Sequence, residues 1–242
     1  MDKVEKIKKC VEESYPGLLK QTFNDNLLSI MLYGSYVSGD FIPGLSDVNI
    51  LVILENPAPD GLGLLGISGH RMMRNCRITP LIMTRTEFIR SADVFPMEYY
   101  DIRNNSRVLF GSDETEALSL TKKNLRHQLE ERLRGTTASL RQVIIASRGK
   151  KKVLGAGLKG IFGSLKALFR NLLRLKSSEE IPAGTEETIR KLGSVFDIDV
   201  NGFQKLLALR KGEKLDVGSL AAEVLDSLQK LVSAVDAMEF GD

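Results

Sequence analysis

A Gly-Ser pair at the end of an apolar run is the first place in this sequence where chemistry is expected. Gly34 and Ser35 follow the run 27–33, and Gly39 comes a few residues later. A glycine lets the backbone turn sharply and come close to a ligand. A serine at the start of a helix offers its hydroxyl, and the free N–H groups there attract phosphate. The sequence therefore predicts a phosphate-binding turn at residues 34–39.

A second polar motif opens the next apolar run, 48–54. Asp47 directly precedes that run, and Asn49 lies two residues further on. Because side chains alternate between the two faces of a strand, Asp47 and Asn49 are expected on the same face. Asp47 could hold Mg²⁺, which prefers a few carboxylates together with phosphate oxygens. Asn49 could add an amide oxygen but no negative charge, so the sequence predicts a weak metal site formed by Asp47 and Asn49.

An ordinary structural role stays open for both motifs. The Gly-Ser pair could be a plain strand-to-helix turn, and Asp47 could be a turn or capping residue. Asp40, Glu98 and Asp101 could supply a further carboxylate, although acidic residues near turns usually have structural roles.

Short apolar runs bounded by turn residues are typical of strands buried in a sheet. Strands of this kind would place the two polar motifs at their ends. The expected strands are 27–33, 48–54, 77–83 and 108–110. Pro80 places the third of these at a sheet edge or a bulge, because proline cannot donate to the ladder.

Helical signals alternate with these strands. An amphipathic helix is expected at 2–15 and should end at Pro16-Gly17, and another should run to about residue 75. Thr84 should begin a short helix, because Thr-Arg-Thr-Glu is typical of a capping box. The first part of the chain therefore has an α+β pattern.

From residue 114 onward, apolar residues recur at helical spacing only. The expected helices are 116–148, 151–176, 185–195, 201–211 and 216–239. The change of pattern predicts two domains, an α+β domain at 1–113 and an all-α helical bundle at 114–242.

The composition is that of an ordinary globular protein of 242 residues, with 43% hydrophobic and 27% charged residues. No apolar run approaches the roughly 20 residues that span a bilayer, and residues 1–9 lack the apolar segment of a signal peptide. Cys10 and Cys76 stand apart in the sequence, without metal-site spacing. These features predict a cytoplasmic protein with reduced cysteines and no transmembrane segment.

The helix expected at 150–176 is the one strongly basic segment. Its lysines and arginines cluster opposite a leucine stripe: Lys152, Lys159, Lys166, Arg170 and Arg174. Such a helix could contact an anionic membrane or a nucleic-acid backbone, or bring cations to a nucleotide's phosphates. It could equally be a bundle helix with a solvated basic face. Its glycines (155, 157, 160 and 163) suggest close packing against another backbone or a break near its start.

The order of the two motifs resembles the nucleotidyltransferase superfamily, which includes the kanamycin-type aminoglycoside adenylyltransferases and DNA polymerase beta. That family has Gly-Ser, a further glycine, and then Ser-Asp-x-Asp on a strand. Gly34, Ser35, Gly39, Ser46 and Asp47 match this pattern in order. The resemblance implies a mixed sheet with a helical C-terminal domain. It also implies that Gly34, Ser35, Gly39 and Ser46 contact ATP or another nucleotide bound with Mg²⁺.

The sequence departs from this family where the metal is bound. Active members have two carboxylates on the second strand and a third on a neighbouring strand. Asn49 replaces the second, and residues 77–83 contain no acid. Nucleotidyl transfer depends on positioning and on metal neutralisation of developing charge.

Three functional hypotheses follow. The leading one is a degenerate nucleotidyltransferase, weakened or inactive, that binds a nucleotide or another phosphorylated ligand in the cleft between the domains. The second is an active metal-dependent adenylyltransferase acting on a small hydroxylated acceptor, with Asp47 and Asn49 as its catalytic residues. The third is an adaptor that binds anionic membrane or nucleic acid through helix 150–176.

Overall fold

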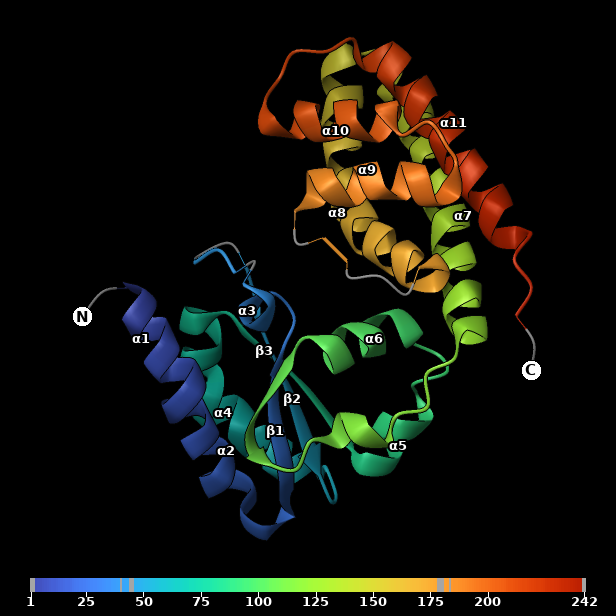
Figure 1. Ribbon diagram of the computed structural model, residues 1–242. Coiled ribbons are helices and arrows are strands. Elements are labelled where there is room, and N and C mark those ends of the chain that lie inside the picture. The colour runs from blue at the N-terminus through green and yellow to red at the C-terminus, as the bar shows by residue number, and fades with distance from the viewer. Residues whose placement is uncertain (1–2, 40, 44–45, 178–180, 183, 241–242) are drawn as a thin grey trace. The chain divides into compact units, whose positions relative to one another are not determined.

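The computed structural model describes residues 3–39, 41–43, 46–177, 181–182 and 184–240. The chain forms two compact units, Met1–Leu120 and Thr121–Asp242 (Figure 1). The first unit contains a sheet with helices on both faces, and the second contains helices alone among its described residues. The fold is therefore α+β with a helical C-terminal region, as the sequence predicts. No helix in the described ranges has the length and apolar character needed to cross a membrane.

A four-stranded mixed sheet forms the centre of the first unit. Its strands are β1 (Leu27–Tyr33), β2 (Val48–Leu54), β3 (Ile78–Thr84) and β4 (Ser106–Gly111). The order is β3-β2-β1-β4, with β1 antiparallel to both β2 and β4, and β3 parallel to β2. Pro80 therefore lies on an edge strand, as its missing N–H group requires.

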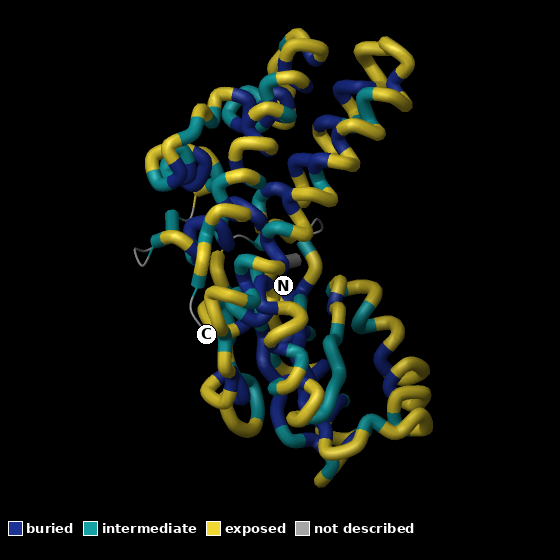
Figure 2. Tube along the Cα trace, turned by 90° about the vertical axis from the view of Figure 1, so that its right-hand side faces the viewer, coloured by how far each residue is buried: buried dark blue, intermediate teal, exposed yellow. Residues whose placement is uncertain are grey.

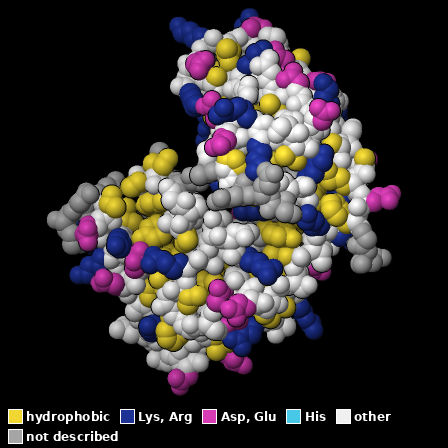
Figure 3. Space-filling view, viewed as in Figure 1, with side chains coloured by type: hydrophobic (Ala, Val, Ile, Leu, Met, Phe, Trp, Pro, Cys, Tyr) yellow, Lys and Arg dark blue, Asp and Glu magenta, His cyan; other side chains and the backbone are white. Residues whose placement is uncertain are grey.

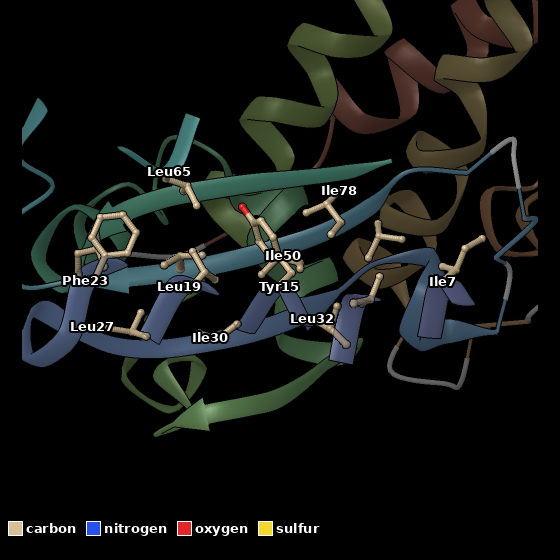
Figure 4. Packing of buried hydrophobic residues seen from close by; sticks show 14 residues of the cluster. Ile7, Tyr15, Leu19, Phe23, Leu27, Ile30, Leu32, Ile50, Leu65 and Ile78 are labelled. Carbon is tan, nitrogen blue, oxygen red and sulfur yellow. The ribbon is translucent and has the colours of Figure 1, made fainter. Parts of the chain in front are cut away.

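Both faces of this sheet are covered, which explains why β1 and β2 are apolar almost throughout. Ile30, Leu32 and Ile50 point into a core shared with the N-terminal helices and with α4 (Pro59–Cys76) (Figure 4). Met31 and Leu51 point the other way, into a core shared with α5 (Arg85–Arg90) and α6 (Pro96–Asn104), which contribute Phe88, Tyr99 and Ile102. Strands β1 and β2 are accordingly almost wholly buried, and they belong to the dark blue part of the tube in Figure 2.

The N-terminal helix does not end at Pro16-Gly17, and that prediction is wrong. Helix α1 (Lys3–Lys9) passes through a π-helical segment, η1 (Cys10–Ser14), into α2 (Tyr15–Phe23). The Tyr15 N–H donates to the Cys10 carbonyl, five residues back. This wider turn comes just before Pro16, which has no N–H to give, so the chain stays helical where a regular α-helix would be disrupted.

The remaining helices described in the first unit are the 3₁₀ turn η2 (Asn24–Asn26), α3 (Ser35–Ser38), α4, α5, α6 and the 3₁₀ turn η3 (Glu114–Ala117). The capping box at the start of α5 is confirmed. The Thr84 hydroxyl accepts from the Glu87 N–H at 3.1 Å, and the Glu87 carboxylate accepts from the Thr84 N–H at 2.7 Å. Leu118 lies in the core shared with α5 and α6, so residues 114–120 pack with the sheet unit.

The second unit consists of α7 (Lys122–Ser147), α8 (Lys151–Lys176), α9 (Thr185–Phe196), α10 (Asn201–Lys211) and α11 (Val217–Asp236). Helix α7 starts later than the predicted residue 116, because residues 114–117 form the separate turn η3. The Thr121 hydroxyl caps α7 by accepting from the Asn124 N–H at 3.2 Å.

The leucine stripe of α8 is the core face of this bundle. Leu158, Leu165 and Leu172 are fully buried there. A Cβ atom at Gly157 would lie 2.3 Å from Val143 of α7, whereas Gly160 has nothing within 4 Å. Close packing therefore explains only part of the glycine content of α8. On the face seen in Figure 3, the second unit carries acidic side chains among its lysines and arginines.

Candidate functional site

The Gly-Ser turn joins β1 to the single-turn helix α3. Gly34 has φ +75° and ψ −147°, a conformation that side chains other than glycine rarely adopt. Its N–H donates to the Asn105 carbonyl at 3.1 Å, and its own carbonyl accepts from the N–H groups of Val37 and Ser38 at 3.0 Å. Gly39 closes the turn with φ +86°. The backbone thus changes direction sharply at both glycines, as the sequence predicts.

Asn49 lies directly against this turn. It is the register partner of Tyr33, the residue before Gly34. A Cβ atom built on Gly34 would lie 3.1 Å from Asn49 Nδ2. The positive φ therefore favours glycine at position 34, and the Asn49 side chain leaves little room for a Cβ atom there. The fold brings Gly34 and Asn49 together.

Asp47 is paired with a cation from its own domain. Its Oδ1 atom lies 2.8 Å from Arg77 Nη2, and the two side chains are 55% and 44% exposed. Arg77 ends helix α4 in the left-handed conformation, at φ +53°. Its carbonyl accepts from the Val48 N–H at 2.8 Å, which fixes the Arg77 backbone beside the start of β2.

The residues at this position do not suit Mg²⁺. Asp47 is engaged with Arg77, and Asn49 contributes no negative charge. Thr79 is the register partner of Asn49 on the parallel strand β3, so that position offers only a hydroxyl. Within the described ranges, no three residues among His, Cys, Asp and Glu gather where they could hold a metal. A hard divalent cation would meet one occupied carboxylate and one neutral amide.

Comparison with known proteins identifies the first unit. A family model described as a nucleotidyltransferase domain matches residues 4–116. This part of the chain belongs to the nucleotidyltransferase superfamily. Among solved structures, the chain is similar to spectinomycin adenyltransferase AAD(9) from Enterococcus faecialis, whose crystal structure contains ATP and spectinomycin. The match covers 90% of this chain and 98% of that one, with 13% identity and a TM-score of 0.53. No curated protein sequence matches the chain.

The fold of the whole chain is therefore like that of an aminoglycoside adenylyltransferase, as the sequence predicts. At 13% identity the likeness concerns the fold alone. The role of each site residue must be argued from this chain's own contacts.

In the nucleotidyltransferase domain, Ser46 has a local structural contact. Its hydroxyl accepts from the Ile42 N–H at 3.0 Å, and its own N–H donates to the Ile42 carbonyl at 2.9 Å. These bonds shape the loop before β2. A ligand contact by Ser46 stays a prediction, as do those by Gly34, Ser35 and Gly39. Asp40 lies outside the described residues.

Three residues that the sequence did not single out form a hydrogen-bonded cluster with the helix that follows the Gly-Ser turn. The Tyr36 hydroxyl of α3 donates to Glu12 Oε1 at 3.1 Å, and Arg107 Nη2 of β4 donates to the same oxygen at 2.7 Å. Burial alone would raise the pKa of Glu12, but the Arg107 and Tyr36 hydrogen bonds outweigh it and lower that pKa. Burial, followed by the charge of Glu12, raises the pKa of Tyr36 to about 12. The cluster therefore keeps an ionised carboxylate and a neutral phenol at neutral pH.

No sequence signal pointed to this cluster, because Glu12 and Arg107 lie on opposite ends of the domain sequence. Arg77 was equally hidden: it follows a helix and precedes a strand, and only the folded chain places it beside Asp47.

On the other side of the strands, burial raises the pKa of Tyr33, with smaller effects from Tyr99 and Glu98. Tyr33 shares its face of the sheet with Asn49, its register partner.

Proposed function

We propose that the nucleotidyltransferase domain binds a nucleotide or another phosphorylated ligand at its Gly-Ser turn and has little or no transferase activity. The observation that carries this proposal is the ion pair between Asp47 and Arg77, at 2.8 Å. It neutralises the one carboxylate of the expected metal site with a cation that belongs to the protein. Metal-assisted transfer is therefore disfavoured, while binding of an anion is not.

The charge balance supports binding over catalysis. An arginine is always protonated in proteins and presents a planar fork that suits phosphate oxygens. Arg77 is 44% exposed, so part of this fork faces solvent beside Asp47. A metal-assisted transfer needs cations at the developing charge of the transition state, and each ~1.4 kcal/mol of lost stabilisation slows the reaction tenfold.

ATP is the first ligand to test, because the structurally similar spectinomycin adenyltransferase was crystallised with it. The full chain is titrated with ATP by calorimetry, once with Mg²⁺ and once with a chelator. We expect binding in both conditions. Ser35→Ala should weaken it by roughly tenfold, since a hydrogen bond to a charged group contributes about 1.5–3 kcal/mol. Ser38→Ala, in the same helical turn, is the matched control and should leave the affinity unchanged.

The competing hypothesis is an active adenylyltransferase, and a transfer assay separates the two. Labelled ATP is incubated with Mg²⁺ or Mn²⁺ and a panel of hydroxylated acceptors. We expect no transfer by the wild type. The double variant Asn49→Asp, Arg77→Asn should gain Mg²⁺ binding, because it supplies two free carboxylates while asparagine tolerates the left-handed conformation at residue 77. Efficient transfer by the wild type over many turnovers would show that the proposal is wrong.

Binding through the basic helix stays a prediction. Its leucine face is used by the bundle core, so a membrane or nucleic acid could be met only by the opposite face. Nothing in the geometry of α8 favours such a partner over solvent.

A further inference from the structure

The two cysteines of the chain, which stand far apart in the sequence, lie together in the fold. Cys10 begins the π-helical segment η1, and Cys76 is the last residue of α4. Both residues line the same cavity, and Cys76 is close enough to contribute to the raised pKa of Cys10. Both are free and half-buried. Nothing in their separation along the chain predicted this proximity.

A cavity of about 600 Å³ opens onto this pair. Cys10 and Cys76 both line it, together with the exposed side chains of His70 and Arg71. In the described part of the chain, the lining contains no acidic residue. A small anionic molecule can therefore approach the thiols without meeting a like charge, and Arg71 offers it a cation.

The two cysteines are also sequence neighbours of two residues at the candidate site, Glu12 and Arg77. Glu12, two residues after Cys10, holds Tyr36 of α3 through a hydrogen bond of 3.1 Å. Arg77, the residue after Cys76, forms the 2.8 Å ion pair with Asp47. A covalent link between Cys10 and Cys76 would therefore join the segment that carries Glu12 to the helix end that precedes Arg77.

We propose that Cys10 and Cys76 are a modification site that a small anionic disulfide, of the glutathione disulfide type, converts into an intramolecular disulfide bond. In the first step one cysteine thiolate attacks a sulfur of the reagent. A mixed disulfide forms, and one reagent thiolate leaves. The second cysteine then attacks the cysteine sulfur of the mixed disulfide and releases the other reagent thiol, which takes up the proton. Two protein thiols are oxidised, and one reagent disulfide is reduced to two thiols.

The environment of the thiols slows the first step at neutral pH. Burial, with a smaller contribution from Cys76, raises the pKa of Cys10 to about 12. Because the thiolate is the nucleophile, the reaction should accelerate as the pH rises.

The test uses the full-length protein and glutathione disulfide. After incubation and removal of the reagent, we expect the intact mass to fall by two hydrogen atoms. Proteolysis without reductant should release a peptide that joins Cys10 to Cys76. The cross-link should raise the thermal midpoint of unfolding, because it closes a long loop in the unfolded chain, and a reductant should reverse the shift.

Single variants keep the test decisive. Cys10→Ser should accumulate a stable glutathione adduct on Cys76, because it lacks the resolving thiol. Cys76→Ser lacks the other thiol of the pair, so it should likewise stop at a glutathione adduct on Cys10. The proposal is overturned if the wild type carries a glutathione on each cysteine, forms only links between two chains, or stays reduced under conditions that modify Cys10→Ser. None of these results depends on nucleotide binding, so this proposal and the proposed function can fail separately.

Discussion

A single arginine changes what the strand β2 can do. Asp47 alone would be read as a metal ligand, but its 2.8 Å contact with Arg77 gives the carboxylate an internal counter-ion. The effect is local, since both side chains are about half exposed and such pairs contribute little to stability. Its consequence lies in the charge offered to a ligand, which is cationic at Arg77 and neutral at Asn49.

A second charged residue, Glu114, yields a prediction about stability. Its side chain is only 4% exposed and accepts two hydrogen bonds from Arg85, both at 2.7 Å, and one from Ser112 at 2.8 Å. The Arg85 hydrogen bonds outweigh burial and lower the pKa of Glu114. The stabilisation is therefore present above the unfolded pKa of about 4.3 and is lost as the pH falls through the lower folded value.

Glu114→Gln should reduce the free energy of unfolding at pH 7 by about 1–3 kcal/mol, because a buried charged acceptor is replaced. Urea unfolding at pH 7 and at pH 3 measures the loss, which should shrink at the lower pH as the wild-type carboxylate takes up its proton. Glu116→Gln, an exposed neighbour, is the control and should be nearly neutral. Equal losses for the two variants would contradict this account.

At the scale of the elements, helix packing in the second unit depends on where glycine is used. Gly202 of α10 faces the backbone of α11, and a Cβ there would lie 2.9 Å from the Glu223 carbonyl carbon and 3.0 Å from the Val224 nitrogen. Backbone cannot move aside as a side chain can. Gly160 of α8 faces open space within 4 Å. The same residue type is thus required in one helix and unfavourable in the other.

Two alanine substitutions should therefore act in opposite directions. Gly202→Ala should destabilise the second unit by roughly 1–3 kcal/mol, because the added methyl group forces α10 away from α11. Gly160→Ala should stabilise it by about 1 kcal/mol through helix propensity. Thermal and urea unfolding of both variants measure this difference. A stable Gly202→Ala protein would show that the two helices separate without cost.

At the scale of the whole molecule, each unit has its own buried core. The sheet unit buries apolar residues on both of its faces, and the helical unit buries the leucine face of α8 among the other helices. Each unit is about 120 residues long, which is a usual size for a domain with one core. The two cores use no common element.

A substitution that destabilises one core should therefore lower the stability of its own unit and leave the other unit nearly unchanged. Leu165 is fully buried, and Leu165→Ala should cost about 2–5 kcal/mol in the stability of the helical unit. Hydrogen exchange should show faster exchange in α7–α11 and little change in β1–β4. Ile145→Ala is the control, since Ile145 is 76% exposed. Equal acceleration in both units would mean that they unfold as one.

Local pattern was enough to predict most elements. Strands β1 and β2 and helices α8 and α10 have the predicted bounds, because apolar periodicity and turn residues are properties of neighbouring residues. The N-terminal helix was the main error, since a proline normally ends a helix and only the π-helical segment before it explains the exception. The Gly-Ser turn was also predictable, because a positive φ favours glycine wherever the turn lies.

Local sequence patterns were thus enough to predict the α+β fold, the superfamily and the neutral amide at Asn49. The pairing of Arg77 with Asp47, the contact of Glu12 with Tyr36 and the proximity of Cys10 to Cys76 emerge only in the folded chain. Strand order and helix placement bring together residues from distant parts of the chain. Periodicity describes each element alone and carries no information about which side chains meet across them.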